Sequence, residues 1–468
     1  MKDVQKQINN KIDEIKEDLI LSTQEIIKIR SVEDEPKEGM PFGEGVAKAL
    51  EYALDKSYEL GFKIRNMNGY IGYAEYGEGE DYVAVLGHLD VVPEGDGWKY
   101  PPYGAEIHDG KMYGRGTLDD KAPIIAALYG LKAIKDLNLP LSKKVRIIFG
   151  TNEESGCGEM PYYMEREKPP VAGFTPDGQY PIIYAEKGIL TFNLVQDLKD
   201  KCSENLIIKS VKGGQRPNMV PDYCEAVIWA KDNNKLLEAL NEFVDKTNLD
   251  LKGEINGGEI TIKSYGVSAH GSTPEKGKNA IMNIFKFLGA LPLGECDLST
   301  YINFFNSYVG TETNGKNFFG KSIKDKPSGE LSFNVGKVNI DEEKASLTIN
   351  MRYPVTYDYD YIMNLFNKRL IYGIKVEDMQ KQKPLYFSPD NPLINALQKV
   401  YTVQTGEEAK LLAIGGGTYA KEMPNIVAFG PIFPGKPDLD HQVNEYIEIV
   451  DLIKNAKIYG NAIYELAK

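Results

Sequence analysis

Hydrophobic positions in the first part of the chain alternate between short β-rich runs and a helical repeat. Residues 82–86 (YVAVL) lead directly into Gly87 and His88, and residues 145–149 (VRIIF) end at Gly150 before several acids. Short apolar runs rich in β-branched residues are typical of buried strands. Residues 124–137 between them carry a helical pattern. This strand–helix–strand order predicts a largely parallel sheet covered by helices.

The N-terminal segment has a different pattern, in which charged residues separate single apolar ones. Ile8, Ile12, Ile15 and Leu19 follow a helical spacing with a polar opposite face. Because no uninterrupted apolar stretch is present, we expect no secretory signal there. No apolar run anywhere in the chain is long enough to cross a bilayer, so we expect no membrane partner.

The pattern changes after about Gly188 and changes back after about Pro384. The intervening segment has period-2 stretches at 260–265 and 345–351 and helical stretches at 234–245 and 359–370. Beyond it we predict a helix at 393–402, a strand at 426–429 and a long helix at 445–466. The predicted fold class is therefore α/β: a discontinuous, mostly parallel-sheet catalytic domain (1–187 and 384–468) with an inserted α+β lid domain (188–383).

Composition narrows the classes of function and location. Apolar residues make up 42% of the 468 residues, which suits packed globular domains. The formal net charge of −13 argues against nucleic acid as a partner, because phosphate binding requires a basic face. The four cysteines (Cys157, Cys202, Cys224 and Cys296) contain no CxxC pair. We expect all four to be free thiols in a cytoplasmic protein.

Three of the four histidines lie in segments that suggest a site: His88, His270 and His441. His88 follows a predicted strand, and ligands of open α/β sheets bind beyond the carboxyl ends of the strands. Asp90, two residues on, could fix the His88 tautomer as a carboxylate behind a ligating imidazole. The alternative is a solvated loop histidine beside a turn-forming Asp.

Acidic residues gather at other element ends. Asp119 and Asp120 precede the helical segment at 124–137, where they could also be helix caps. Glu153 and Glu154 follow the strand at 145–149, and neighbouring carboxylates favour a cation between them, with one Glu as ligand and the other as proton carrier. The alternative there is an exposed acidic turn.

Two further acids complete the set. Asp177 lies in a Thr-Pro-Asp-Gly turn, and Asp440 precedes His441 just before the predicted C-terminal helix. Each also fits an ordinary turn or helix start. Taken together, histidine nitrogens and carboxylate oxygens without thiolates suit zinc, cobalt or manganese. Two such metals about 3.5–4 Å apart require one shared carboxylate.

The chain also resembles a known family, in order from about Asp81 to His441. The segments that carry the resemblance are GHLDVVPEGDGW, GRGTLDDKAP, TNEESG, TPDG, SAHGSTPEKGKNA, INMRYP, IGGGTYA and DLDHQ. They are similar to the co-catalytic zinc peptidases that include aminoacylases, carnosinases and glutamate carboxypeptidases, and most similar to the bacterial PepV-type dipeptidases.

The resemblance implies a role for each candidate residue. His88 and Asp177 would bind one metal, Glu154 and His441 would bind the other, and Asp119 would bridge the two metals. The peptide bond between Asp119 and Asp120 would be cis. Glu153 would be the general base, and Asp90 would support His88. From the lid, His270 would stabilise the oxyanion. The substrate contacts would be Asn218, Arg352 and the backbone of Gly415, Gly416 and Gly417.

Alternatives remain at several points. Arg352 could be a strand-edge ion pair, and the three glycines a flexible turn. Ala122 stands where the family commonly has Gly, a change of small cost because a helix start tolerates Ala well. Lys421 stands where the family commonly has Arg, which bears on substrate preference and not on the chemistry.

The function that follows is hydrolysis of dipeptides by a cytoplasmic enzyme with two divalent metal ions, most simply zinc, with manganese or cobalt as alternatives. An N-acyl amino acid deacylase or a carboxypeptidase of the same family is the main rival. A non-catalytic binding protein is disfavoured because Glu153 and all five ligands are present. The lid could be a dimerisation module, but its length suits a doubled lid and a monomer.

Overall fold

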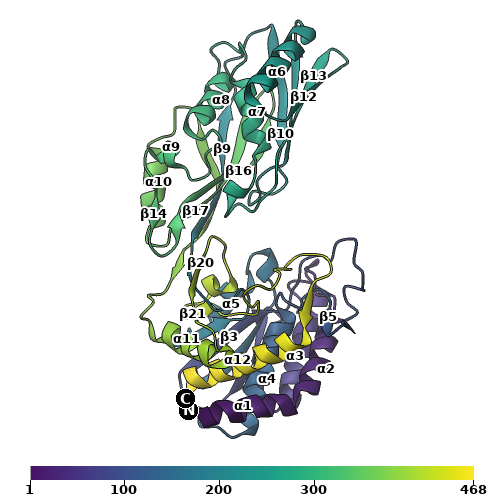
Figure 1. The fold of residues 1–468 in the computed structure, drawn as a ribbon, viewed down its shortest axis with the longest axis vertical. Helices are drawn as coiled ribbons and strands as arrows, with labels where there is room; N and C mark the ends of the chain where they lie inside the picture. Colours follow the sequence, from purple (N-terminus) through teal and green to yellow (C-terminus); the bar gives the residue numbers. More distant parts are fainter. Residues whose placement is uncertain (1) are drawn as a thin grey trace. The chain divides into compact units, whose positions relative to one another are not determined.

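The computed structural model describes residues 2–468, which form two units, each built around its own large sheet (Figure 1). The first unit comprises residues 2–184, Phe387–Leu412 and Gly417–Lys468. The second unit comprises Ala185–Tyr386 and Ala413–Gly416. The chain therefore builds most of the first unit, completes nearly all of the second, and then returns.

The sheet of the first unit is parallel at its centre. Its strand order is β1-β2-β6-β3-β7-β21-β8-β19, and β6, β3, β7 and β21 run parallel to one another. The outer pairs are antiparallel. Every residue of β3 is buried, as expected for a parallel strand covered on both faces. The strands are β1 (Lys63–Met67), β2 (Ile71–Tyr76), β3 (Tyr82–His88), β6 (Lys144–Gly150), β7 (Ala172–Thr175), β8 (Ile182–Glu186), β19 (Leu385–Tyr386), β21 (Ile426–Ala428) and β20 (Leu411–Ile414), which pairs with β8.

Helices pack around this sheet and against each other. Helix α4 is buried along its whole length except at Lys132, Lys135 and Asp136 near its end, which marks it as a core helix. It crosses α12 so closely that a Cβ on Gly130 would lie 2.7 Å from the Gly460 nitrogen. The helices of this unit are α1 (Lys2–Glu14), α2 (Lys16–Ile27), α3 (Glu44–Glu59), α4 (Lys121–Asp136), α5 (Glu159–Met164), α11 (Pro392–Thr405) and α12 (Ile449–Ala467).

The predicted C-terminal helix begins later than expected. Residues 445–448 were assigned to it, but Tyr446–Glu448 form strand β22. This strand pairs antiparallel with β5 (Lys111–Tyr113), which pairs with β4 (Glu106–His108). The prediction was wrong at these residues because a strand this short contributes too few positions to break a helical pattern.

The second unit is an antiparallel sheet with helices packed on it. Its strand order is β12-β13-β11-β10-β16-β17-β9-β18. Burial alternates along β11 and β13, as in a sheet with one covered face. The strands are β9 (Gly188–Asp197), β10 (Leu206–Gly213), β11 (Tyr223–Ala230), β12 (Leu251–Asn256), β13 (Glu259–Tyr265), β14 (Lys324–Asp325), β15 (Gly329–Glu330), β16 (Ser332–Ile340), β17 (Lys344–Tyr353) and β18 (Lys375–Gln382). The helices are α6 (Asn233–Thr247), α7 (Ala280–Leu288), α8 (Asp297–Tyr308), α9 (Lys316–Phe319) and α10 (Tyr359–Asn367).

The predicted fold class is confirmed. The parallel core, the separate antiparallel sheet and the helices at 124–137, 234–245 and 393–402 all match observed elements. The N-terminal pattern forms α1 and α2, which meet at Ile15. Within the described residues, no helix combines the length and the apolar character that a membrane crossing requires.

The expectation of four free thiols was wrong for two of them. Cys202 and Cys296 form a disulfide across 94 residues of sequence, with their Cα atoms 5.0 Å apart. Cys157 and Cys224 are free. Sequence spacing could not reveal the pair, because the fold alone brings the β9–β10 connection to the start of α8. Disulfides are rare in reducing compartments. This bond therefore removes the argument for a cytoplasmic location that rested on four free thiols.

Candidate active site

Parallel strands of the first unit deliver several candidate residues to one edge of the sheet. His88 is the last residue of β3, Glu153 and Glu154 follow β6, and Asp177 follows β7. Strands β6, β3 and β7 are adjacent and parallel, so their carboxyl ends share one edge. This is where open α/β sheets bind ligands.

Five predicted ligands converge there in two groups that share one carboxylate. His88, Asp119 and Asp177 form the first group, and Asp119, Glu154 and His441 form the second; the ligand atoms within each group lie within 4.8 Å of one another. Asp119 uses a different oxygen toward each histidine: Oδ1 lies 2.8 Å from His88 Nε2 and Oδ2 lies 3.0 Å from His441 Nε2. The structure therefore brings all five residues together around Asp119.

The donor set suits two divalent cations. Each group offers one imidazole nitrogen and two carboxylate oxygens, the ligands that zinc, manganese and cobalt accept. Glu154 Oε2 lies 3.0 Å from His441 Nε2. With carboxylates outnumbering histidines in a half-buried site, added positive charge would stabilise the arrangement.

Asp119 is held in place by the backbone around it. The Asp119–Asp120 peptide bond is cis, as the family resemblance implies. Asp120 is fully buried, and its Oδ2 accepts a hydrogen bond from the His88 backbone N–H at 3.2 Å. A Cβ on Gly87 would lie 2.3 Å from that Asp120 oxygen. Residue 87 must therefore be glycine for the strand end and the Asp119 loop to meet.

Glu445 anchors the same loop and was missed by the sequence analysis. Its Oε1 accepts backbone N–H groups from Gly116 at 3.1 Å and Leu118 at 2.7 Å, and its Oε2 pairs with Arg115 at 2.7 Å. Both side chains of that pair are nearly inaccessible, at 0% and 2% exposure. Burial raises the pKa of Glu445 to about 7. The available signal was the Arg in GRGTLDD, a cation with no assigned partner.

Asp90 supports two parts of the site at once. Its Oδ1 lies 3.5 Å from His88 Nδ1, and its backbone carbonyl lies closer to that nitrogen, at 3.0 Å. The carboxylate accepts hydrogen bonds from the backbone N–H groups of Glu153 and Glu154, at 3.1 and 3.0 Å. Asp90 thus orients the His88 ring and fixes the turn that carries both glutamates.

Proton affinities in the site reflect crowded carboxylates. Burial, followed by repulsion from Asp177, raises the pKa of Glu153 well above its ordinary value. Burial, followed by Asp119, raises the pKa of Asp177 to about 6. Hydrogen bonding to Asp119 and Glu154 raises the pKa of His441 to about 11. A carboxylate with a raised pKa is suited to accepting and returning a proton near neutrality.

The segment 438–442 is a loop, so the helix-start alternative for Asp440 and His441 was wrong. Helix α12 begins only at Ile449, and His441 has a φ of +63°. This left-handed conformation is uncommon for a residue with a side chain. His441 is also the more exposed histidine of the site, with 48% of its side chain accessible.

The remaining candidates lie in the second unit, except Gly417, which belongs to the first. The Gly271 N–H donates to the Asn218 carbonyl at 2.7 Å, and Met219 bridges to His270, so the segments of Asn218 and His270 lie together. His270 Nδ1 lies 2.6 Å from Ser272 Oγ. Partial burial and the charge of Arg352 lower the pKa of His270.

Arg352 is 4% exposed and contacts the predicted glycine loop. Its Nη1 donates to the Gly415 carbonyl at 2.6 Å, and its Nε donates to Asn350 Oδ1 at 3.2 Å. Burial lowers its pKa to about 10, which leaves it positively charged at neutral pH. Arg352 therefore contacts Gly415 through the Gly415 carbonyl. Both hydrogen-bond partners of Arg352 are neutral, so the alternative of a strand-edge ion pair finds no support.

Fold and ligand groups together define an α/β protein with a candidate two-cation centre at a sheet edge. The model of Peptidase family M20/M25/M40 matches residues 84–465. The chain belongs to this peptidase family, which confirms the resemblance seen in its motifs.

Curated relatives match almost the whole chain. A Bacillus subtilis (strain 168) protein named "Putative dipeptidase YtjP" is 42% identical over 459 residues, covering 97% of this chain and 98% of its own length. A Staphylococcus haemolyticus protein, also named a "putative dipeptidase", is 34% identical over 463 residues, with coverage of 97% and 98%.

Solved structures share the fold at low sequence identity. The di-peptidase Dug1p of Saccharomyces cerevisiae matches with a TM-score of 0.59 and 16% identity, covering 99% of each chain. Human carnosine dipeptidase 1 matches with a TM-score of 0.58 and 16% identity, covering 99% of this chain and 98% of its own. These two likenesses support the fold assignment.

Proposed function

We propose that this chain hydrolyses the peptide bond of dipeptides at a centre of two divalent cations. The observation that carries the proposal is the pair of ligand groups that share Asp119, with Glu153 on the turn beside them. The names of the full-length relatives point to the same substrate class. Zinc suits the ligands best, and manganese or cobalt would also fit.

The residues of the first unit would divide the work as follows. His88 and Asp177 would hold one cation, Glu154 and His441 the other, and Asp119 both. Cations bound there would supply Lewis acidity and make water a stronger nucleophile. Glu153 would take the proton of the attacking water and return it to the leaving amine. Asp90 would hold the His88 ring and the turn that carries Glu153 in position.

Residues of the second unit would bind and polarise the substrate. Uncharged His270 would donate a hydrogen bond to the developing oxyanion, a contribution of about 2.7–4 kcal/mol by analogy with other donors of this kind. Arg352, whose planar fork matches a carboxylate, would bind the C-terminal end of the dipeptide together with Asn218. The backbone N–H groups of residues 415–417 would add to that anion site.

The proposal is tested by metal analysis and turnover of a Glu153→Gln variant. We expect two cations per chain in both proteins and a fall in kcat of about 10²–10⁴-fold in the variant. Glu165→Gln, which changes an exposed glutamate, is the matched control and should keep full activity. A Glu153→Gln enzyme with wild-type kcat and full metal would exclude the mechanism.

A substrate panel separates dipeptidase from the related activities. Dipeptides with free termini should be cleaved, whereas N-acetyl amino acids and tetrapeptides should not. Efficient release of acetate would indicate a deacylase, and stepwise shortening of tetrapeptides a carboxypeptidase.

A further inference from the structure

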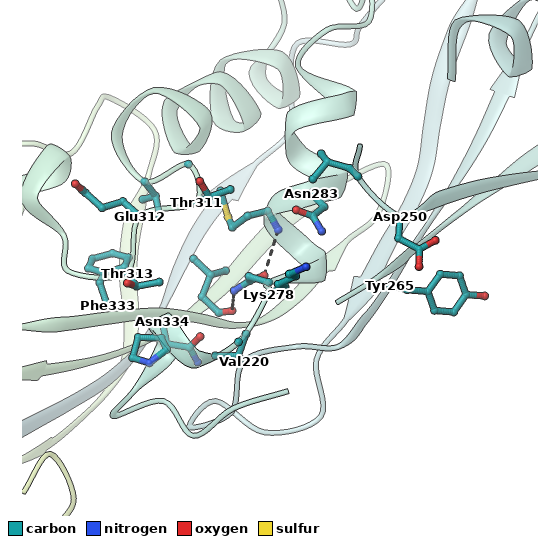
Figure 2. A pocket seen from close by; sticks show the side chains of 18 of the residues that line it. Val220, Asp250, Tyr265, Lys278, Asn283, Thr311, Glu312, Thr313, Phe333 and Asn334 are labelled. Carbon is teal, nitrogen blue, oxygen red and sulfur yellow. Dashed lines mark hydrogen bonds between the residues drawn. The ribbon is translucent and has the colours of Figure 1, made fainter. Parts of the chain in front are cut away.

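The second unit contains a cavity of about 310 Å³ (Figure 2). Its lining comes from the start of α7, the 309–313 loop after α8, strand β16 and the turns at 248–250 and 274–279. All lining residues belong to the second unit. The volume is at the small end of the range for ligand pockets, which points to a small molecule.

Asn334 forms a fixed part of the cavity wall. It is 1% exposed, and its Nδ2 donates to the carbonyls of Pro217 at 2.9 Å and Met219 at 2.8 Å. Its Oδ1 has no hydrogen-bond partner among the described residues and is itself buried out of reach of the cavity. Asn334 therefore shapes the wall, and its neighbours in the lining supply the groups that would meet a ligand.

Asn283 lies across the cavity from Asn334 (Figure 2). It is on α7 and is 7% exposed, so a second primary amide is nine-tenths buried at the same site. An amide can donate and accept hydrogen bonds. The Asn283 amide therefore suits a ligand that carries both donors and acceptors.

The remaining lining combines apolar surface with both signs of charge. Met282 and Phe333 are buried at 2% exposure each and offer an apolar wall. The half-buried Glu312 and the exposed Lys278 supply a carboxylate and an ammonium group. A molecule with an ammonium group, a carboxylate and an apolar tail would satisfy all of these features.

We propose that this cavity binds a free α-amino acid with an apolar side chain. Its ammonium group would donate to Glu312, whose Oε2 also accepts the Asn317 backbone N–H. Its carboxylate would accept from Asn283 and Lys278, and its side chain would lie against Met282 and Phe333. This binding does not depend on the proposed function.

Binding here would reach the proposed substrate contacts through Asn334. The two carbonyls that Asn334 holds flank Asn218, and the Asn218 carbonyl accepts the Gly271 N–H next to His270 at 2.7 Å. Because Asn334 is part of the cavity wall, an occupant would pack against the residue that holds the backbone on both sides of Asn218. This consequence rests on the proposed function: free amino acids are the products of dipeptide hydrolysis, and the cavity would sense them.

The test is calorimetric titration of the metal-loaded full chain with L-leucine. Asn283→Leu fills the cavity with an apolar group, and Glu312→Gln removes its carboxylate; each should weaken binding about tenfold or more. Asn303→Leu, on the exposed side of α8, is the matched control and should leave affinity unchanged. 3-Methylbutylamine and 4-methylpentanoate, which each lack one charged group of leucine, should bind far more weakly than leucine.

Two results would overturn the site. The first is that leucine does not bind at tens of millimolar. The second is that leucine binds both Asn283→Leu and Glu312→Gln as tightly as wild type, because leucine would then bind at another site. The coupling is measured separately as the effect of leucine on the KM for a dipeptide. Competition by leucine as a product at the active site is common to wild type and Asn283→Leu, so the coupling is the part of the change that Asn283→Leu loses. If no dipeptide is hydrolysed, the proposed function fails while the titration still decides the site.

Discussion

The first unit contains two clusters of charge, and they are built in opposite ways. Around Arg146 on β6, Glu75 and Glu167 each pair with the guanidinium at 2.8 Å, and Arg65 pairs again with Glu167. Around Asp119, carboxylates outnumber the two histidines.

The Arg146 cluster is complete, because every acid in it has a cation from the chain itself. The Asp119 cluster leaves carboxylates with raised pKa values, as burial and mutual repulsion predict. The difference teaches that buried charge marks function only where the chain fails to balance it. The four predictions below test this contrast, from the largest expected effect to the smallest.

Asp119→Asn should remove the ligand that both groups share. The amide offers one neutral oxygen in place of two charged ones, so we expect fewer than two bound cations per chain. Transition-state stabilisation worth several kcal/mol would be lost, which is about 10³-fold in turnover. Metal analysis and kcat measure both effects. Asp136→Asn, at the end of α4, is the control; full metal in Asp119→Asn would contradict the shared site.

Arg146→Met should instead unfold the protein more easily without touching the metal content. Removing Arg146 leaves two half-buried carboxylates, with only Lys144 near Glu75 and Arg65 near Glu167 among the described residues, at a cost of about 3 kcal/mol in the free energy of unfolding. Denaturant unfolding measures it. The control is Arg166→Met, whose pair with Glu165 is 43% and 72% exposed and should matter by about 0.5 kcal/mol or less. An equal effect of both substitutions would mean that the Arg146 cluster is not structural.

Glu159→Gln should flatten the pH dependence of stability. Glu159 is fully buried, one of its oxygens accepts the Tyr419 hydroxyl, the other is unpaired, and burial raises its pKa from 4.5 to about 7. Its stabilising contribution is therefore complete below about pH 4.5 and is lost as pH rises through about 7, a change of about 3 kcal/mol. Unfolding free energies of chelator-treated proteins at several pH values check it. An unchanged slope in the variant would place the titration elsewhere.

Glu445→Gln should have the smallest effect, on cation affinity. Gln retains an acceptor for the loop N–H groups but loses the charge that pairs with Arg115. Substitutions of residues that support a ligand weaken metal binding by about 10–100-fold. Competition with a chromophoric chelator measures this affinity. Unchanged affinity would show that the loop holds Asp119 without Glu445.

Much of the fold was predictable because the sheet core is a local signal. The runs at 82–86 and 145–149 are continuous and apolar, and both became central parallel strands. Failures occurred where the signal was short or non-local. Tyr446–Glu448 form a strand only because β5 lies beside them, and the Cys202–Cys296 bond needs the folded second unit.

The candidate site was predictable to a similar extent as the fold. His88, Glu154 and Asp177 follow strands whose parallel order places their ends together, so their convergence could be expected. Glu445 was missed because most of its partners are backbone N–H groups of a loop more than 300 residues away, and the one signal in the sequence was that Arg115 had no assigned partner. The roles of His270, Asn218 and Arg352, the identity of the metal and the monomeric state stay predictions.

The amino-acid sequence by itself determined the fold class, the family and the set of candidate ligands, because residues at strand ends and ordered motifs are local patterns. Only the tertiary structure decided that Asp119 gives one oxygen to each candidate ligand group, that Glu445 holds the Asp119 loop, and that Asn283 and Asn334 line one cavity. The physical reason is that these features depend on distances between atoms remote in sequence, and packing alone sets those distances.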